Sequence, residues 1–379
     1  MHRPSLTWVI KSSKRCNLRC AYCYEYESLN DDARIPSSVF DALFRVTREV
    51  SEHFSANPKY CWHGGEPLLL EPAYYQAALE AQRRVFNDCE RRPLNVIQTN
   101  LTAVSAKTIE LLKRFDHVSI SLDVIGGDRV TTAGKDSQQR VLRNMATVRE
   151  EGISFGAISV LTRKNYCGVD QIFDFFNETG ISFRLLPYYR SSSASQRDQF
   201  SLTPDQVAGA VRRLIDRWFT SNRGITVAPV DQYVWYATLH MFGTNGDRHH
   251  YNKLSREHVL VVDTNCDVYG VADTYSPNHR YGNLLSNSAA EIVASAGRQL
   301  AATEAASRMS QTCQTCDYFG ACSGWPAAEA TALERDDTNN QFKCVIAKQA
   351  IARACEWVAT VPIDEFDRAQ HRSPHQLEH

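Results

Sequence analysis

The chain has 379 residues, 43% of them hydrophobic, and a formal net charge of −1. This length is enough for one large domain or two ordinary ones, and the balanced charge creates no field that would attract nucleic acid or an anionic membrane. No apolar run approaches the roughly 18 residues that span a bilayer, and the N-terminus lacks the apolar core of a signal peptide. We therefore expect a cytoplasmic protein with no nucleic-acid partner and no membrane association.

Short β-like runs alternate with helical patterns over the first half of the chain. Runs rich in β-branched and aromatic residues predict strands at 7–11, 59–62, 95–99, 117–122, 155–161 and 183–186. Apolar residues at helical spacing predict helices at 38–54, 74–86, 106–115, 138–151 and 169–177. Six such units indicate a parallel sheet, and six are too few for a closed eight-unit barrel. We therefore predict an α/β fold built on a partial (β/α)6 TIM-like barrel.

The second half of the chain has a different pattern. A serine run predicts a polar linker over 191–202, and a helix is predicted over 204–219. Apolar runs at 260–263 and 267–271 predict a hairpin before the last group of cysteines. We therefore expect a partial barrel, a linker and helical bridge, a small cysteine-bearing domain and a tail, at residues 1–190, 191–255, 256–360 and 361–379.

The cysteines gather in two places. Of the 12, three lie within residues 16–23 and four within 313–344. Disulfides are rare in cytosolic proteins, so the two groups indicate two metal sites. The scattered cysteines are more typical of buried small hydrophobic residues; they are Cys61, Cys89, Cys167, Cys266 and Cys355.

The first group, Cys16-x3-Cys20-x2-Cys23, follows a predicted strand. Iron–sulfur clusters take thiolate ligands at short loop spacings, and three ligands would leave one iron open. Structural zinc takes four ligands, and a redox pair would use Cys20 and Cys23 alone, so both alternatives fit the spacing less well.

This segment closely resembles the signature of radical S-adenosylmethionine (SAM) enzymes, with Tyr22 at the aromatic position beside the last cysteine. The resemblance implies that a [4Fe–4S] cluster on these cysteines binds SAM at its open iron. It also implies that one electron, from a donor such as flavodoxin or ferredoxin, cleaves SAM to a 5′-deoxyadenosyl radical that abstracts a substrate hydrogen.

Further matches to the family follow in chain order. His63-Gly64-Gly65-Glu66-Pro67 resembles the glycine-rich segment that meets the SAM amino group, and Gln98-Thr99-Asn100 resembles a segment near SAM. Ser121-Leu122-Asp123 resembles the strand end that helps to hold the ribose. Arg129 matches the arginine that pairs with the SAM carboxylate, and Leu161 begins the segment near the adenine. The resemblance thus implies that the cofactor-binding residues are Gly64, Gly65, Glu66, Asn100, Ser121, Asp123, Arg129 and Leu161.

The second group consists of Cys313-x2-Cys316-x5-Cys322 and Cys344. Four thiolates at this spacing suit zinc or a [4Fe–4S] cluster. The segment resembles the SPASM extension of peptide-modifying radical SAM enzymes, such as the anaerobic sulfatase-maturing enzymes, which implies one auxiliary [4Fe–4S] cluster on these four cysteines.

Relatives with this extension usually carry a second, inner auxiliary cluster. Cys266 resembles its first ligand, but Asn287 and Pro326 stand where the family has cysteine. We therefore expect the inner cluster to be absent and formylglycine-type oxidation to be disfavoured.

The resemblance implies a ribosomally made precursor peptide as substrate, modified by side-chain hydrogen abstraction and crosslinking of the cyclophane type, through a C–C or C–heteroatom bond. No peptide-binding domain is expected before the barrel. Peptide epimerisation, sulfatase maturation, radical chemistry on a small molecule and a zinc-bound inactive scaffold remain alternatives. A general base is not identified; the candidates that the sequence does not rank are Glu25, Glu27, Tyr188, Tyr189 and Arg190.

Overall fold

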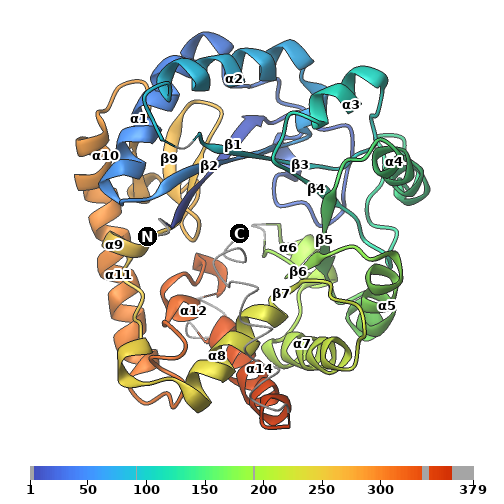
Figure 1. Ribbon diagram of the computed structural model, residues 1–379, viewed down its shortest axis with the longest axis vertical. Coiled ribbons are helices and arrows are strands. Elements are labelled where there is room, and N and C mark those ends of the chain that lie inside the picture. The colour runs from blue at the N-terminus through green and yellow to red at the C-terminus, as the bar shows by residue number, and fades with distance from the viewer. Residues whose placement is uncertain (1–3, 91, 191–192, 335–340, 361–379) are drawn as a thin grey trace. The chain divides into compact units, whose positions relative to one another are not determined.

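The computed structural model describes residues 4–90, 92–190, 193–334 and 341–360 (Figure 1). The predicted tail at 361–379 lies outside the described residues. Contacts divide the chain into two compact units. Unit 1 comprises Met1–Leu122, Gly127–Gly156 and Lys253–Thr303, and unit 2 comprises Asp123–Gly126, Ala157–Asn252 and Glu304–His379. The four-part division expected from the sequence stays a prediction, because these units follow contacts and are discontinuous in the chain.

A mostly parallel sheet forms the centre of unit 1. Its parallel strands are β1 (Ser5–Ser13), β2 (Asn57–Gly64), β3 (Leu94–Thr99) and β4 (His117–Ser121). The predicted hairpin is confirmed as β8 (Val259–Val262) and β9 (Asp267–Gly270), and β10 (Arg280–Asn283) follows. β8 pairs in parallel with β1, so this hairpin extends the barrel sheet, in the order β10-β9-β8-β1-β2-β3-β4.

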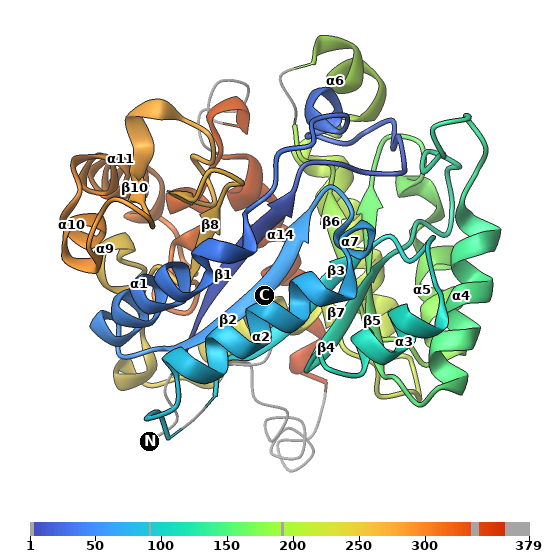
Figure 2. The ribbon, with the colours of Figure 1, turned by 90° about the horizontal axis from the view of Figure 1, so that it is seen from above.

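Helices cover one face of this sheet (Figures 1 and 2). Those of unit 1 are α1 (Phe40–His53), α2 (Pro72–Val85), α3 (Ala106–Leu112), α4 (Gln138–Glu150), α9 (Lys253–Arg256) and α10 (Ala289–Ala294). The longer α11 (Ala296–Cys313) begins in unit 1 and ends in unit 2. The short 3-10 helices along the chain are η1 (Tyr26–Ser28), η2 (Ser37–Val39), η3 (Pro67–Leu69), η4 (Tyr166–Gly168), η5 (Asn245–Asp247) and η6 (Pro277–His279).

Unit 2 contains three parallel strands, β5 (Phe155–Leu161), β6 (Phe183–Pro187) and β7 (Val227–Ala228). β5 begins in unit 1. The helices are α5 (Val169–Thr179), α6 (Ala194–Phe200), α7 (Pro204–Phe219), α8 (Val230–Phe242), α12 (Trp325–Ala328) and α14 (Phe342–Val358). α14 packs against α7 and α8.

The six predicted strands and the helices between them are confirmed, and with them the α/β fold. Within the described residues the strands do not close into a barrel, because β10 and β7 each pair on one side only. The predicted linker at 191–202 is wrong in part, since it contains α6. The Ser193 hydroxyl caps this helix by accepting the backbone N–H of Gln196 (3.5 Å), and Phe200 at its end is fully buried. In the described part of the chain, no helix is long and apolar enough to cross a membrane.

The two faces of the unit 1 sheet differ in chemistry. Successive residues of a strand point to opposite faces. Trp8, Tyr60 and Trp62 are buried on the face that packs against Phe40 and Phe44 of α1, with mostly edge-to-face rings. The opposite face of the sheet is formed by alternate positions on β1 to β4, which include Lys11, Cys61, His63, Gln98 and Ser121. This polar face is the one that can serve a reaction.

A buried ion network fixes the segment that leads into β8. The Glu257 carboxylate lies 2.9 Å from Lys253 Nζ and 3.4 Å from Arg298 Nε, and all three side chains are at most 3% exposed. Tyr281 on β10 donates its hydroxyl to the same carboxylate (2.9 Å). One buried acid therefore compensates two buried cations.

We predict that Glu257→Leu lowers the free energy of unfolding by about 3–5 kcal/mol, because it leaves two buried cations without their anion. Asp41→Ala is the control: it breaks an ion pair to Arg84 in which both side chains are about half exposed (47% and 60%), and it should change little. Urea denaturation measures both. Equal stabilities of the two variants would show that the network is dispensable.

Candidate functional site

The loop after β1 carries Cys16, Cys20 and Cys23 and is clamped along its length. The backbone N–H of Arg19 donates to Val130 O (2.7 Å), and that of Ala21 donates to Asp128 O (2.9 Å). A turn bond from Cys23 N to Cys20 O (3.0 Å) brings the last two cysteines together. The loop is thus held by backbone contacts that do not depend on its side chains.

The three thiols lie near one another in a desolvated place. Burial raises the pKa of Cys16 to about 11 and that of Cys23 to about 12, and neighbouring cysteines add to both shifts. Such thiols are protonated until a metal takes the place of the proton. Three grouped thiols on a fixed loop fit the cluster that the sequence predicts.

Gly64 and Gly65 bring the end of β2 against this loop. Gly65 N donates to Ser13 O (2.7 Å), and Glu66 N donates to Arg15 O (2.9 Å). A Cβ on Gly64 would lie 2.2 Å from Ser13 O, and one on Gly65 would lie 2.2 Å from Arg15 O. Gly64 also has a φ of +124°, which favours glycine. The two glycines therefore allow a backbone contact that no other residue permits.

Glu66 ties the ends of β2 and β3 together. Its side chain is buried and accepts hydrogen bonds from Leu68 N (2.9 Å), Thr99 Oγ1 (2.6 Å) and Asn100 N (2.7 Å). Burial raises the pKa of this carboxyl, while the three donors act in the opposite direction. The role of Glu66 in this structure is to hold Asn100 in place.

Asn100 connects β3 to the cysteine loop. Its Nδ2 donates to Asn17 Oδ1 (2.9 Å) and lies 3.8 Å from Cys16 Sγ. Its Oδ1 accepts the backbone N–H of Thr102 (2.9 Å). An amide this close to a cluster ligand is well placed to orient the loop or a bound cofactor.

Ser121 and Arg129 complete the group of predicted residues in unit 1. The Ser121 hydroxyl accepts from Gln98 Nε2 (2.8 Å), and Arg129 Nη1 donates to the Tyr22 hydroxyl (2.9 Å). Unit 1 thus brings together the three loop cysteines and six of the eight predicted cofactor-binding residues, which are Gly64, Gly65, Glu66, Asn100, Ser121 and Arg129.

The other two predicted residues lie in unit 2. Asp123 Oδ1 accepts the backbone N–H of Val160 on β5 (2.9 Å), so this carboxylate fastens the segment before β5. Leu161 is fully buried at the end of the same strand. Cofactor binding by all eight residues stays a prediction.

The second cysteine group, called the outer cysteines below, consists of Cys313, Cys316, Cys322 and Cys344 and lies within unit 2. Cys313 ends α11, Cys316 and Cys322 lie in the following turn, and Cys344 lies on α14. All four line one pocket, together with Pro326. Burial raises the pKa of Cys313 and Cys322 to about 11 and that of Cys344 to about 12.

The four thiols lie in the wall of a pocket and do not converge on a single point. Across the residues that the structure describes, no three His, Cys, Asp or Glu side chains converge closely enough to hold a single metal ion. A pocket with four thiols in its wall, of which Cys313 is buried and the other three are partly exposed, fits a cluster that is several ångströms wide.

Cys266, which resembles the first ligand of the family's inner cluster, lies in unit 1. Cys266 is fully buried in the β8–β9 turn with a φ of +68°. Asn287 uses its side chain locally, because its Oδ1 accepts Asn283 N (2.9 Å) at the end of β10. Asn287 therefore closes a turn at the position where the family has a cysteine ligand of the inner cluster. The absence of the inner cluster stays a prediction.

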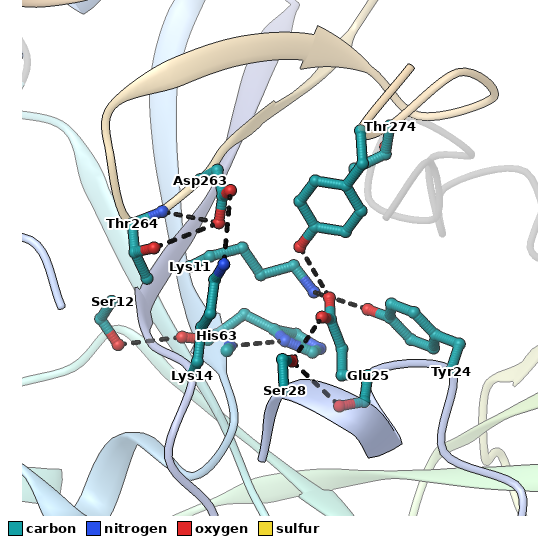
Figure 3. Close-up of polar contacts among 12 residues, drawn as sticks. Lys11, Ser12, Lys14, Tyr24, Glu25, Ser28, His63, Asp263, Thr264 and Thr274 are labelled. Atoms are coloured by element: carbon teal, nitrogen blue, oxygen red, sulfur yellow. Dashed lines mark hydrogen bonds and ion pairs between the residues drawn. The ribbon is translucent and has the colours of Figure 1, made fainter. Parts of the chain in front are cut away.

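Sequence reasoning missed a polar network on the open face of the sheet. Lys11 Nζ donates to the Tyr24 hydroxyl (2.6 Å) and to Glu25 Oε1 (3.2 Å), and Tyr275 also donates to Glu25 Oε1 (2.7 Å; Figure 3). Glu25 was one of the base candidates, whereas Lys11 and Tyr275 were not considered. A lysine in an otherwise apolar strand was the available signal for Lys11; Tyr275 had none, because it depends on where the hairpin lies.

We predict that Gly65→Ala displaces residues 13–15 and lowers the iron bound by the first cysteine group by at least half, because the new Cβ would lie 2.2 Å from Arg15 O. Gly209→Ala on α7 is the matched control, since no heavy atom of a neighbouring residue lies within 4 Å of its new Cβ. Colorimetric iron determination after anaerobic reconstitution compares the two. Full iron loading of Gly65→Ala would show that the close contact is not required.

We also predict that His63 makes the protein acid-sensitive. Burial and the Lys11 ammonium lower the pKa of His63 to about 3, below the ordinary value of 6.5. Between these values the unfolded chain binds a proton that the folded chain does not, so stability falls as the pH falls through this window. His63→Gln should lose less unfolding free energy between about pH 7 and about pH 4.5 than the wild type. Urea denaturation at several pH values tests this, and parallel pH profiles would contradict it.

Comparison with known proteins agrees with the geometry. Residues 10–176 match the family described as the Radical SAM superfamily. A serine-type anaerobic sulfatase-maturating enzyme of Bacteroides thetaiotaomicron is 23% identical over 335 residues, covering 82% of this chain and 79% of that protein. A cysteine-type anaerobic sulfatase-maturating enzyme of Clostridium perfringens is 23% identical over 370 residues, covering 91% and 95%.

Solved structures show the same fold. The enzyme anSMEcpe with bound AdoMet and Cp18Cys peptide matches with a TM-score of 0.72 and 18% identity, covering 94% of this chain and 98% of that chain. Streptococcus suis SuiB bound to S-adenosylmethionine matches with a TM-score of 0.52 and 15% identity, covering 76% and 65%. Residues 10–176 are therefore a radical SAM domain, and over most of its length the chain is similar to anaerobic sulfatase-maturating enzymes.

Proposed function

We propose that this enzyme modifies a ribosomally made precursor peptide by abstracting a side-chain hydrogen and forming a cyclophane-type crosslink, with one auxiliary cluster. One observation carries the proposal: the four outer cysteines line a common pocket. The resemblance adds that Asn287 and Pro326 stand where the family has cysteine ligands of the inner cluster. An enzyme with a single auxiliary cluster lacks an electron acceptor at the inner position. Coupling of two parts of one peptide removes two hydrogen atoms: one would pass to the deoxyadenosyl radical, and the other would leave as a proton while its electron returns to the SAM cluster or to the auxiliary cluster on the four outer cysteines.

The cofactors fit the residues present. Cys16, Cys20 and Cys23 would hold a [4Fe–4S] cluster with SAM, which supplies a 5′-deoxyadenosyl radical able to abstract hydrogen from an unactivated carbon. The protein keeps the cysteine loop in place through the backbone contacts of Gly65 and Glu66. Asn100 and Arg129 offer polar groups beside the loop, through Nδ2 and the guanidinium. A flavodoxin or ferredoxin is the expected source of the electron.

A peptide substrate has independent support. The anSMEcpe structure, which shares this fold, contains a bound peptide. The polar face of the unit 1 sheet carries Lys11, His63 and Ser121 on neighbouring or nearby strands, where backbone and side-chain amides of a peptide could be bound. The protein has to hold the peptide and exclude water, while the radical chemistry belongs to the cofactor.

Sulfatase maturation is the second candidate. It is favoured by the similarity to sulfatase-maturating enzymes over 82% and 91% of this chain. Oxidation of a side chain to an aldehyde and formation of a crosslink each remove two hydrogen atoms from the peptide, so both pass one electron to an acceptor and the inner-site residues do not separate the two candidates. The two candidates differ in their product, since a crosslink leaves no carbonyl group.

We predict that the anaerobically reconstituted protein binds about eight irons and forms 5′-deoxyadenosine from SAM and dithionite. The triple variant Cys16→Ala/Cys20→Ala/Cys23→Ala should bind about four irons and form none. The matched variant Cys313→Ala/Cys316→Ala should also lose about four irons but keep the first site. Zinc without iron, or no deoxyadenosine from the wild type, would refute the assignment.

The product is tested with short peptides encoded beside the gene and with a synthetic sulfatase segment that contains its target cysteine or serine. Crosslinking predicts a peptide that loses two hydrogen atoms and does not react with hydrazine reagents. Tandem mass spectrometry locates the bond by the missing fragments between the joined residues. Conversion of the sulfatase segment to a hydrazine-reactive aldehyde, together with about twelve irons, would favour the second candidate.

A further inference from the structure

Lys11 and His63 lie side by side on the polar face of the unit 1 sheet. They are register partners on β1 and β2, so both side chains leave the sheet on the same side. Glu25 approaches them from the cysteine loop, and Figure 3 shows the three side chains directed toward one another. Glu25 follows Cys23 by two residues. The group therefore lies beside the loop that holds the first cluster.

Lys11 and Glu25 form a buried, electrically neutral pair. Nζ and Oε1 are 3.2 Å apart, and the side chains are only 5% and 13% exposed. Tyr275 donates to Oε1 (2.7 Å), whereas Oε2 accepts one long hydrogen bond from the Ser28 hydroxyl (3.3 Å). The pair is thus fixed on the Oε1 side, and Oε2 keeps capacity to accept another hydrogen bond.

His63 presents a hydrogen-bond donor beside this pair. Its Nδ1 accepts the backbone N–H of Gly64 (2.7 Å), so in the neutral ring the proton is on Nε2. The low pKa keeps the ring neutral at physiological pH. Within the described residues Nε2–H has no hydrogen-bond partner, and the side chain is partly exposed. This N–H is available to a ligand.

Two tyrosines of this network are exposed to solvent. Tyr24 is 43% exposed and Tyr275 is 37% exposed, although their hydroxyl groups contact Lys11 and Glu25. Exposed aromatic rings whose hydroxyls are anchored are typical of surfaces that contact a partner. A peptide that contacts these rings would lie next to Lys11 and Glu25, which the two hydroxyl groups contact.

The available groups match one chemical class. An amide offers a carbonyl oxygen to a donor and an N–H to an acceptor, as His63 Nε2–H and Glu25 Oε2 require. Glu25 would repel a carboxylate, and no unpaired cation would offset this repulsion. Lys11 would repel an ammonium group, and no unpaired anion would offset that repulsion. Neutrality of the pair thus disfavours both charged groups relative to a neutral one.

We propose that His63 and Glu25, positioned by Lys11 and Tyr275, bind a neutral amide of the peptide substrate and so hold the target residue beside the SAM cluster. The amide is a backbone peptide group or the carboxamide of asparagine or glutamine. This inference rests on the proposed function for its substrate. His63 and Glu25 contact the ligand, and Lys11 is a positioning residue that also sets the preference for neutral groups.

The test uses the reconstituted holoenzyme, with acetamide and acetate as probes at matched ionic strength. Diethyl pyrocarbonate reacts with the unprotonated nitrogen of a neutral imidazole, so modification at the accessible Nε2 of His63 requires the proton to move to Nδ1 and the hydrogen bond from Gly64 N to open. An amide bound to Nε2–H covers this nitrogen and holds its proton, and peptide mass spectrometry reports the modification of His63 without any turnover. We expect acetamide to slow modification of His63 in a concentration-dependent way and acetate to have at least tenfold lower apparent affinity. Equal protection by both probes, or none by either, would overturn the inference.

Variants test the charge argument. Glu25→Gln leaves the Lys11 ammonium uncompensated and should reverse the preference, so that acetate protects His63 better than acetamide. Lys11→Met/Glu25→Gln is neutral again and should remove the preference for acetate. Glu27→Gln, two residues further along and outside the network, is the matched control and should behave as the wild type. An unchanged preference in Glu25→Gln that folds normally by circular dichroism would refute the role of the pair.

The two proposals fail in different ways. Absence of deoxyadenosine or of a modified peptide would refute the proposed function and leave the His63 footprint unaffected. Normal peptide modification without amide protection of His63 would refute the inference alone.

Discussion

The contact between two backbones is the constraint on which this site depends. The end of β2 lies against the start of the cysteine loop. Gly64 and Gly65 are so close to the carbonyls of residues 13–15 that their Cα hydrogens fit but a Cβ atom would not. From this contact Glu66 reaches β3, and Asn100 reaches back to Cys16 and Asn17. The loop is therefore oriented by the sheet before any metal is bound. Preorganisation of this kind spares the cofactor from ordering its own ligands.

The same strands serve packing and chemistry on opposite faces. Trp8 and Trp62 bury large rings under the helices and place their indole N–H groups on Ser51 (3.1 Å) and Asn95 (3.0 Å). The register of β1 with β2 then sets the neighbouring positions, Lys11 and His63, side by side on the other face.

Much of this arrangement could be predicted from the sequence. Strand and helix periodicity predicted the six units, and the motif residues Cys16, Gly65, Asn100 and Asp123 each follow a strand, as predicted. Local signals suffice for this, because in parallel sheets the strand ends meet at one edge. Register was not predictable in the same way: the pairing of β8 with β1 joins residues about 250 positions apart through backbone groups that every sequence shares.

Side-chain networks were the other feature that the sequence did not reveal. Tyr275 contacts Glu25 because the β8–β9 hairpin extends the sheet. Ser193 begins α6 because Phe200, at the end of this helix, is buried. Both depend on tertiary contacts that residue type does not specify. Conversely, Asn287 and Pro326 were informative in the sequence because they depart from a pattern, and the structure shows that Asn287 has a local use.

The in-register pairing of Lys11 with His63 also restricts how the length of this chain can change. A single inserted residue within β1 before Lys11 would turn the lysine toward the helices and bring a neighbouring apolar residue to the polar face. A deletion in β2 would do the same to His63. Insertions and deletions among relatives that share this network should therefore fall in the connecting loops, and a bulge such as the one between Lys11 and Ser13 is the place in β1 where an extra residue is absorbed.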